Sequence, residues 1–370
     1  MIYINNFKRI QSLINNSCGK ILYLIIKKRT KMSITLNSPL DMHLHLRDET
    51  MLSVVAPLSA ESFSGAIIMP NLVPPVSSKE ELLAYKNRIL NNCNSKNFTP
   101  YMTLFFKPTY SKEFLESIKN ELTAIKLYPA GITTNSEGGL SGFDVDELRP
   151  TLDAMSELDI PLCVHGETNG FVMDREAEFV SIYEMLASNF PNLKIIMEHI
   201  TTKESVEALD KFDNLYATIT LHHLLITLDD VAGGMLQPHL FCKPIAKRPK
   251  DREALRKVAL EGHPKVMFGS DSAPHPQHAK ESCGCAAGVF TAPIALQVLT
   301  ELFVEHSNVE KLQAFVSKNA QKIYSNLDIP NKVITLEKKE FQVPHKYHDV
   351  VPMYAGETLA YSITNIQENN

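Results

Sequence analysis

Residues 161–199 read PLCVHGETNGFVMDREAEFVSIYEMLASNFPNLKIIMEH, a segment with two short apolar runs on either side of a helical pattern. The apolar runs are Pro161–His165 and Lys194–His199, and the helical pattern covers Glu176–Asn189. Two strands joined through a helix are typical of a parallel pair with a crossover connection. Both runs end in a histidine, so we expect polar side chains at the carboxyl end of this pair.

The same alternation extends over most of the chain from residue 33 onward. Further strand-like runs are the segment around Leu40–Leu44, Ser64–Met69, Tyr101–Phe106, Ala124–Tyr128, Leu215–Thr220 and Lys265–Gly269. Helical patterns between them cover Lys79–Asn92, Lys112–Leu122, Val145–Leu158, Ser205–Lys211 and Arg252–Glu261. About eight strands in this order predict a (β/α)8 TIM barrel. A doubly wound sheet is the alternative, and periodicity does not separate the two.

The polar residues favour the barrel. They stand at or just after the ends of separate strand-like runs: His45, Lys126, His165, His199 and Asp271. Active sites of (β/α)8 barrels are built at the carboxyl ends of several strands. After residue 300, two helical patterns (Thr300–His306 and Leu312–Lys322) and a short extended run (Lys332–Leu336) predict a small C-terminal extension that covers part of the barrel.

Composition indicates an ordinary globular enzyme. The chain has 370 residues, 44% hydrophobic and 21% charged, with a net charge of −5, which argues against nucleic acid as a partner. Six irregularly spaced cysteines favour reduced thiols and a cytoplasmic location, and Cys283-Gly284-Cys285 lacks the second pair typical of a zinc site. Apart from the first residues, we expect one catalytic domain, residues 33–370, with no membrane segment.

Residues 1–32 form a basic N-terminal extension. The first 31 residues include Lys8, Arg9 and Lys20 and have no acidic residue. The apolar stretch Ile21–Ile26 is too short for a secretory or membrane segment. Met32 could be the true start, so this extension is excluded from the fold prediction.

The motif Asp41-Met42-His43-Leu44-His45-Leu46-Arg47 suggests a metal site. Residues two apart on a strand point to the same face, so both imidazoles can reach one ion. When the motif stands alone, a chance pair of histidines at a strand end is the better explanation.

Lys126 ends an apolar run, where a buried cation needs a partner. The side chain could extend to solvent or pair with a carboxylate. Alternatively, burial could keep the amine neutral, and a neutral amine can take up CO2 to become an anionic carbamate ligand.

His165, His199 and Asp271 end three further runs. A single histidine at a strand end is usually a hydrogen-bonded core residue, and an aspartate there can cap a turn. Together with His43 and His45, however, they place four imidazoles and a carboxylate at one rim, a set of ligands that suits a metal ion. Glu167 and Glu198 are interpreted as supporting or ordinary polar residues.

In this order the motifs resemble those of the dihydroorotase family, in its shorter homodimeric bacterial type, within the amidohydrolase superfamily. The matching segments are Asp41–Asp48, Met69–Pro75, Lys126–Ala130, Val164–Glu167, Glu198–Thr202 and Gly269–His275. The resemblance runs from about residue 34 to about residue 360. It implies reversible hydrolysis of dihydroorotate to N-carbamoyl-aspartate in pyrimidine biosynthesis, and a homodimer.

The resemblance also implies the residues of the site. Two Zn²⁺ ions per subunit would be bound by His43, His45, Lys126, His165, His199 and Asp271, and carboxylated Lys126 and a hydroxide would bridge them. Asp271 would be the catalytic proton carrier. Substrate contacts would come from His45, Arg47, Asn71, His165, Lys243, His275 and Ala287. Thr133 and Thr134 would belong to a lid loop that closes on the substrate.

Arg47, Asn71 and His275 match the positions that bind the substrate carboxylate in that family. Lys243 stands where another member of the family has leucine, so its contact is expected through the backbone. Two other functions remain open: a hydantoinase-like cyclic-amide hydrolase, which needs no carboxylate clamp, and a catalytically silent homologue that acts as a scaffold.

Overall fold

The computed structural model describes residues 33–93, 97–325 and 327–368. Its largest sheet has eight parallel strands in sequential order. They are β2 (Leu40–Leu44), β3 (Gly65–Ile68), β4 (Thr99–Phe105), β5 (Ala124–Leu127), β6 (Leu162–Val164), β7 (Ile195–Met197), β8 (Leu215–Ile219) and β9 (Val266–Phe268). Each predicted strand-like run is therefore confirmed, and the basic extension 1–32 lies outside the described residues.

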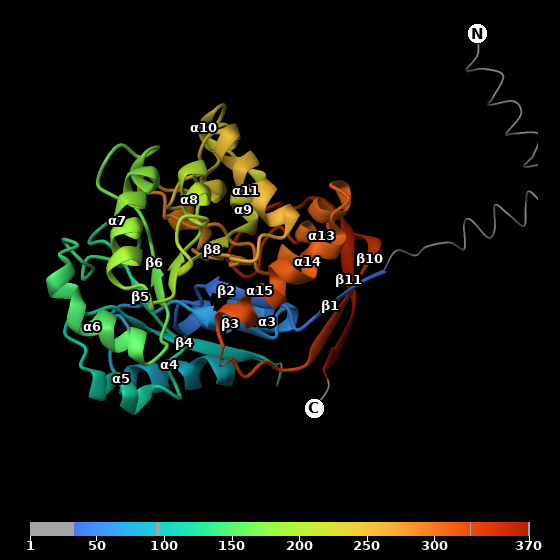
Figure 1. Cartoon of the computed structure of the whole chain (residues 1–370). Helices are drawn as coiled ribbons and strands as arrows, with labels where there is room; N and C mark the ends of the chain where they lie inside the picture. The colour runs from blue at the N-terminus through green and yellow to red at the C-terminus, as the bar shows by residue number, and fades with distance from the viewer. Residues whose placement is uncertain (1–32, 94–96, 326, 369–370) are drawn as a thin grey trace, which may run out of the picture.

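The sheet curves until its first and last strands meet. Backbone hydrogen bonds join Asp271 N to His43 O over 2.8 Å and His45 N to Ser272 O over 3.3 Å. Asp41 adds a side-chain contact, because its carboxylate accepts from the amide and the hydroxyl of Ser270. A doubly wound sheet would reverse its strand order at a switch point. The sequential order and this closure confirm the (β/α)8 barrel (Figure 1).

Helices surround the barrel (Figure 1). Those that follow the strands are α3 (Glu49–Ser62), α4 (Lys79–Asn92), α5 (Lys112–Ile118), α6 (Val145–Glu157), α7 (Arg175–Asn189), α8 (Lys203–Ala208), α9 (Leu221–Leu225), α10 (Leu228–Ala232), η1 (Pro238–Leu240), α11 (Pro249–Glu261) and α12 (Gln277–Lys280). Sequence reasoning missed α3, which contains Pro57. It placed the start of α8 too late, whereas Thr202 caps this helix by accepting from the amide of Ser205.

The C-terminal extension contains helices and a second sheet. The helices are α13 (Ala295–Glu305), α14 (Val309–Gln313), the π-helical turn η2 (Ala314–Lys318) and α15 (Asn319–Ile323). Strand β10 (Lys332–Gln342) pairs antiparallel with β1 (Ser33–Asn37) and β11 (Thr358–Glu368), so the two ends of the described chain meet in this sheet (Figure 1). The prediction of an extended run at Lys332–Leu336 is confirmed, although the strand continues further.

Side chains inside the barrel change from apolar to polar along β5, β6 and β7. An apolar layer includes Leu40, Met42, Ile67, Ala124, Cys163, Ile196 and Met267, and residues of α15 pack against it. Two residues further along β5, β6 and β7 lie Lys126, His165 and Glu198, which are buried. Because alternate residues of a strand share a face, these polar side chains continue the interior column. The barrel therefore has an apolar floor and a polar mouth.

Among the described helices, none has the length and apolar character needed to cross a membrane.

Glu176 at the start of α7 fixes the loop that carries His199. Its carboxylate accepts from the amides of Thr201 and Thr202, from both threonine hydroxyls, and from Ser205 Oγ over 2.7 Å. These groups are buried, so removing the carboxylate leaves several donors without an acceptor. Such donors are expensive to leave unpaired.

We expect Glu176→Ala to lower the free energy of unfolding by about 3 kcal/mol, estimated from the loss of hydrogen bonds to a charged group. Denaturant unfolding followed by circular dichroism measures the change. Glu184→Ala on the same helix is the control, because its surface ion pair with Lys211 is worth roughly 0–1 kcal/mol. Equal destabilisation by the two substitutions would contradict this role of Glu176.

Candidate active site

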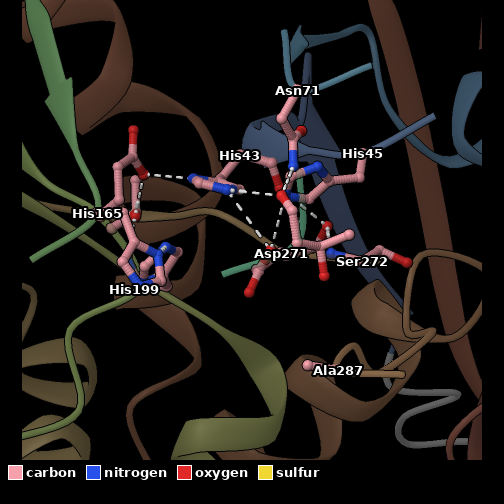
Figure 2. A network of polar contacts seen from close by, with 12 residues as sticks. His43, His45, Asn71, His165, His199, Asp271, Ser272 and Ala287 are labelled. Carbon is pink, nitrogen blue, oxygen red and sulfur yellow. Dashed lines mark hydrogen bonds and ion pairs between the residues drawn. The ribbon is translucent and has the colours of Figure 1, made fainter. Parts of the chain in front are cut away.

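His43, His45 and Asp271 converge at the mouth of the barrel, where β2 and β9 meet (Figure 2). His43 Nε2 lies 3.4 Å from His45 Nε2, and Asp271 Oδ1 lies 3.1 Å from His45 Nε2 and 3.5 Å from His43 Nε2. One ligand atom of each residue falls within 4.8 Å of the other two, so the group could hold a metal ion. All three side chains are buried.

A bulge in β2 produces this convergence. The register with β3 shifts between Asp41 and Leu44. Met42 packs into the interior layer, whereas Leu44 packs outside the barrel, so strict alternation is broken between them. A bulge of this kind changes the direction in which the side chains of the strand point. The expected convergence of His43 and His45 occurs, but simple strand parity is not the reason.

His165 and His199 form a second pair of imidazoles beside the first (Figure 2). His165 Nδ1 lies 3.2 Å from His199 Nε2, and the ring centroids of His43 and His199 are 4.9 Å apart. All four histidines line the same pocket. This arrangement suits two cations side by side, with nitrogen ligands for the second.

His199 enters the pocket through an unusual backbone conformation. By strand parity Glu198 points into the barrel, and His199 has a φ of 41°, in the left-handed region. Asp271 (φ 41°) and Arg47 (φ 57°) share this conformation. Non-glycine residues adopt it at a cost of about 1–3 kcal/mol, and such strain gathers at functional sites. Holding these three residues in the left-handed conformation therefore lowers the stability of the barrel while it directs their side chains.

Lys126, on β5, is fully buried. Its amine has no hydrogen-bond partner in the described part of the chain, and it stands 5.0 Å from the centroid of the Tyr128 ring. Burial lowers the pKa of Lys126. Of the alternatives that the sequence left open, neither exposure to solvent nor a carboxylate partner is found in the described part of the chain. A buried amine without a hydrogen-bond partner, near His165 and His199, suits the remaining alternative of a lysine carbamate.

Two carboxylates orient the histidines. Glu198 Oε2 accepts from His43 Nδ1 over 2.7 Å and from Thr218 Oγ1 over 2.5 Å, while Glu167 Oε2 lies 2.9 Å from His165 Nε2. A carboxylate on one ring nitrogen fixes the ring and its tautomer and raises the basicity of the other nitrogen. The sequence suggested such supporting roles without indicating which histidine each glutamate contacts.

Arg47 and Asn71, two of the predicted carboxylate-binding residues, line the same pocket, and the third, His275, contacts Arg47. Arg47 Nη2 is 3.0 Å from His275 Nε2, which is also 3.0 Å from the carbonyl oxygen of Ala287. Burial, with Arg47 beside it, lowers the pKa of His275 to about 3, so the ring is neutral near pH 7. The guanidinium can therefore offer its donors to an anion beside the metal ligands.

Asn71, Lys243 and the loop around Thr133 and Thr134 complete the pocket. Tyr128 and Gly288 also line it and were not predicted. Apart from the buried position of Tyr128 at the end of a strand, the sequence carried no signal for them.

A second buried group, His222, His223 and Cys242, was also missed. Its ligand atoms lie within 4.8 Å of one another. Both ring nitrogens of His223 already have partners, Thr220 Oγ1 at 2.9 Å and the carbonyl of Pro244 at 3.0 Å. We therefore assign His223 to the support of the segment that carries Lys243.

Known proteins resemble this chain in both sequence and fold. The model of the amidohydrolase family matches residues 40–326. The chain belongs to the amidohydrolase family. A dihydroorotase of Helicobacter acinonychis is 45% identical over 340 residues, which are 90% of this chain and all of the relative.

Two solved structures extend the comparison. The crystal structure of dihydroorotase from Campylobacter jejuni superposes with a TM-score of 0.87 at 60% identity, covering 91% of this chain and 98% of that one. Dihydroorotase from Saccharomyces cerevisiae in complex with 5-fluoroorotic acid has a TM-score of 0.85 at 32% identity, covering 91% and 100%. Family membership and the His43–His45–Asp271 group together indicate a metal-dependent enzyme.

We expect Glu198→Gln to weaken metal binding. The amide cannot accept from His43 Nδ1 and Thr218 with the strength of a carboxylate, so His43 loses its fixed orientation and basicity. Substitutions of such supporting partners cost about 10–100-fold in metal affinity. Competition with a chromophoric chelator measures the change. Unaltered affinity in a folded Glu198→Gln protein would show that the contact with His43 is only structural.

Proposed function

We propose that this enzyme is a dihydroorotase, which interconverts (S)-dihydroorotate and N-carbamoyl-L-aspartate in the synthesis of pyrimidine nucleotides. The observation that carries the proposal is the position of Arg47, which His275 contacts, beside the metal-ligand cluster in one pocket. A cyclic amide that also bears a carboxylate is the substrate that such a site recognises at two points. Homology to proteins named dihydroorotase supports this choice.

The residues fit two Zn²⁺ ions. His43, His45 and Asp271 would hold one, His165 and His199 the other, and carboxylated Lys126 would lie between them. The carbamate forms when the Lys126 amine attacks CO2 and releases a proton, which turns an uncompensated buried amine into an anion. When bound, the ions lower the pKa of a water molecule and polarise the ring carbonyl.

The remaining steps belong to the side chains of the chain itself. Arg47, Asn71 and His275 bind the carboxylate of the substrate and thereby fix which ring carbonyl faces the cluster. Asp271 takes the proton of the attacking water and delivers it to the ring nitrogen as the carbon–nitrogen bond breaks. Ring closure uses the same groups in reverse, with Asp271 removing the proton from the nitrogen.

The backbone around residues 243 and 287 would contact the pyrimidine ring, and Thr133 and Thr134 would donate to the bound substrate. We further propose that residues 33–370 form one catalytic unit, that the enzyme acts in the cytoplasm, and that it is a homodimer like the family it resembles.

Lys126→Ala tests the two-metal assignment. We expect turnover of dihydroorotate by the zinc-reconstituted protein to fall at least about a hundredfold, since the ligand between the ions is lost. Turnover is measured from the absorbance of dihydroorotate and the metal content from elemental analysis. The control is Lys119→Ala, a substitution of an exposed lysine. Unchanged turnover in Lys126→Ala would remove the bridging carbamate from the mechanism.

Arg47→Gln tests the substrate. A charge-assisted contact with a carboxylate contributes about 3 kcal/mol, so kcat/KM for dihydroorotate should fall roughly a hundredfold while the zinc content stays constant. Hydrolysis of an uncharged hydantoin by both proteins is the matched comparison. A wild-type enzyme that turns over hydantoin but not dihydroorotate would instead establish the hydantoinase-like function, and inactivity toward both would favour a silent homologue.

A further inference from the structure

The loop of residues 129–140 covers the pocket and behaves as a separate piece of structure. Its stem is closed by hydrogen bonds from Ala130 N to Leu140 O and from Leu140 N to Tyr128 O. Its centre is the buried Ser136, whose backbone carbonyl accepts from the amides of Gly131 and Gly139 and whose hydroxyl accepts from the amide of Thr133. Most of its hydrogen bonds are internal, so the loop can move without unfolding the barrel.

Side chains from two other parts of the barrel rim hold this loop in place. Asn71, after β3, donates to the carbonyl of Thr134 over 2.9 Å, and its own carbonyl accepts from Asn135 Nδ2 over 3.0 Å. On the other side, Lys243 Nζ, from the segment after β8, donates to the carbonyl of Ile132 over 3.0 Å. The loop itself follows β5, so these contacts span the mouth of the barrel between β3 and β8.

The segment that carries Lys243 is rigid. The Lys280 ammonium donates to the carbonyl of Phe241 over 2.9 Å and also to those of Ala286 and Gly288. His223 Nε2 donates to the carbonyl of Pro244 over 3.0 Å. The chain is therefore held by buried side chains on both sides of Lys243, at Phe241 and at Pro244, which gives the lysine a fixed base for its contact with the loop.

The closed loop leaves little room beneath it. The pocket lined by His43, Asp271, Thr133 and Lys243 encloses a cavity of about 20 Å³. A single water molecule requires roughly 10–15 Å³ by this measure. A six-membered ring with a carboxylate does not fit, so the loop has to move before such a ligand can enter or leave. The contacts made by Asn71 and Lys243 are broken when it does.

We propose that Lys243 is a latch: its ammonium holds the 129–140 loop closed through the carbonyl of Ile132 and so sets how readily the pocket admits and retains its ligand. Asn71 is also placed to bind the ligand, so the ligand competes with the loop for the Asn71 side chain. Lys243 attaches to the loop backbone instead and acts through the loop, as a positioning residue. The identity of the ligand rests on the proposed function, whereas the latch itself does not.

Hydrogen exchange measured by mass spectrometry tests the latch in zinc-reconstituted protein without substrate. We expect peptides that cover residues 129–140 to exchange about tenfold faster in Lys243→Met, because the loop opens more often. Lys243→Arg keeps a charged donor and should restore slow exchange. Lys250→Met, at an exposed lysine on α11, is the control and should match the wild type. Melting temperature and zinc content verify that each variant folds.

Kinetics separate the latch from a direct contact with substrate. For a latch, binding and release of dihydroorotate both become about tenfold faster in Lys243→Met, because the loop opens more often with and without ligand, KM changes less, and neither rate change depends on ionic strength. An unchanged rate of loop exchange in Lys243→Met overturns the proposal, whatever happens to KM. A KM effect that disappears at high salt, with normal exchange, would assign Lys243 to substrate binding. Inactivity of the wild type toward dihydroorotate would refute the proposed function and leave the exchange test intact.

Discussion

Burial of many polar groups in a small volume is the constraint on which this structure depends. Four imidazoles, a lysine amine and an aspartate lie at the mouth of an otherwise apolar barrel. Burial opposes the charged form of each group, and close imidazoles cannot all be protonated. This group of buried ligands is therefore suited to bound cations, which supply the positive charge that the ligands lack. Glu198 and Glu167 orient two of these ligands for the cations through their contacts with His43 and His165.

The barrel and the approximate membership of the site could be predicted from sequence because both depend on local patterns. Parallel strands place their carboxyl ends at one rim, so polar residues that end successive apolar runs, such as Lys126 and His165, gather there. The regular alternation of strands and helices gave the strand number. The pattern missed α3, which contains Pro57, although α6 was predicted despite Pro150.

Features that depend on distant contacts could not be predicted. The bulge of β2 follows from its pairing with β3, and His199 turns into the pocket through a left-handed backbone fixed by neighbouring elements. Likewise, the sheet of β1, β10 and β11 joins segments nearly three hundred residues apart. The two glutamates beside His43 and His165 were visible as residues, but their partners were not.

Lys243 shows why a departure from a family pattern can be informative. A leucine at that position could pack at the rim but could not donate to a carbonyl. The ammonium instead joins the loop to a segment held by Lys280 and His223. Metal ligands have to be rigid because their geometry determines the chemistry, whereas the loop has to open in every cycle. Attachment through one lysine to a backbone carbonyl satisfies both needs, since it can break without disturbing any ligand of the metal cluster.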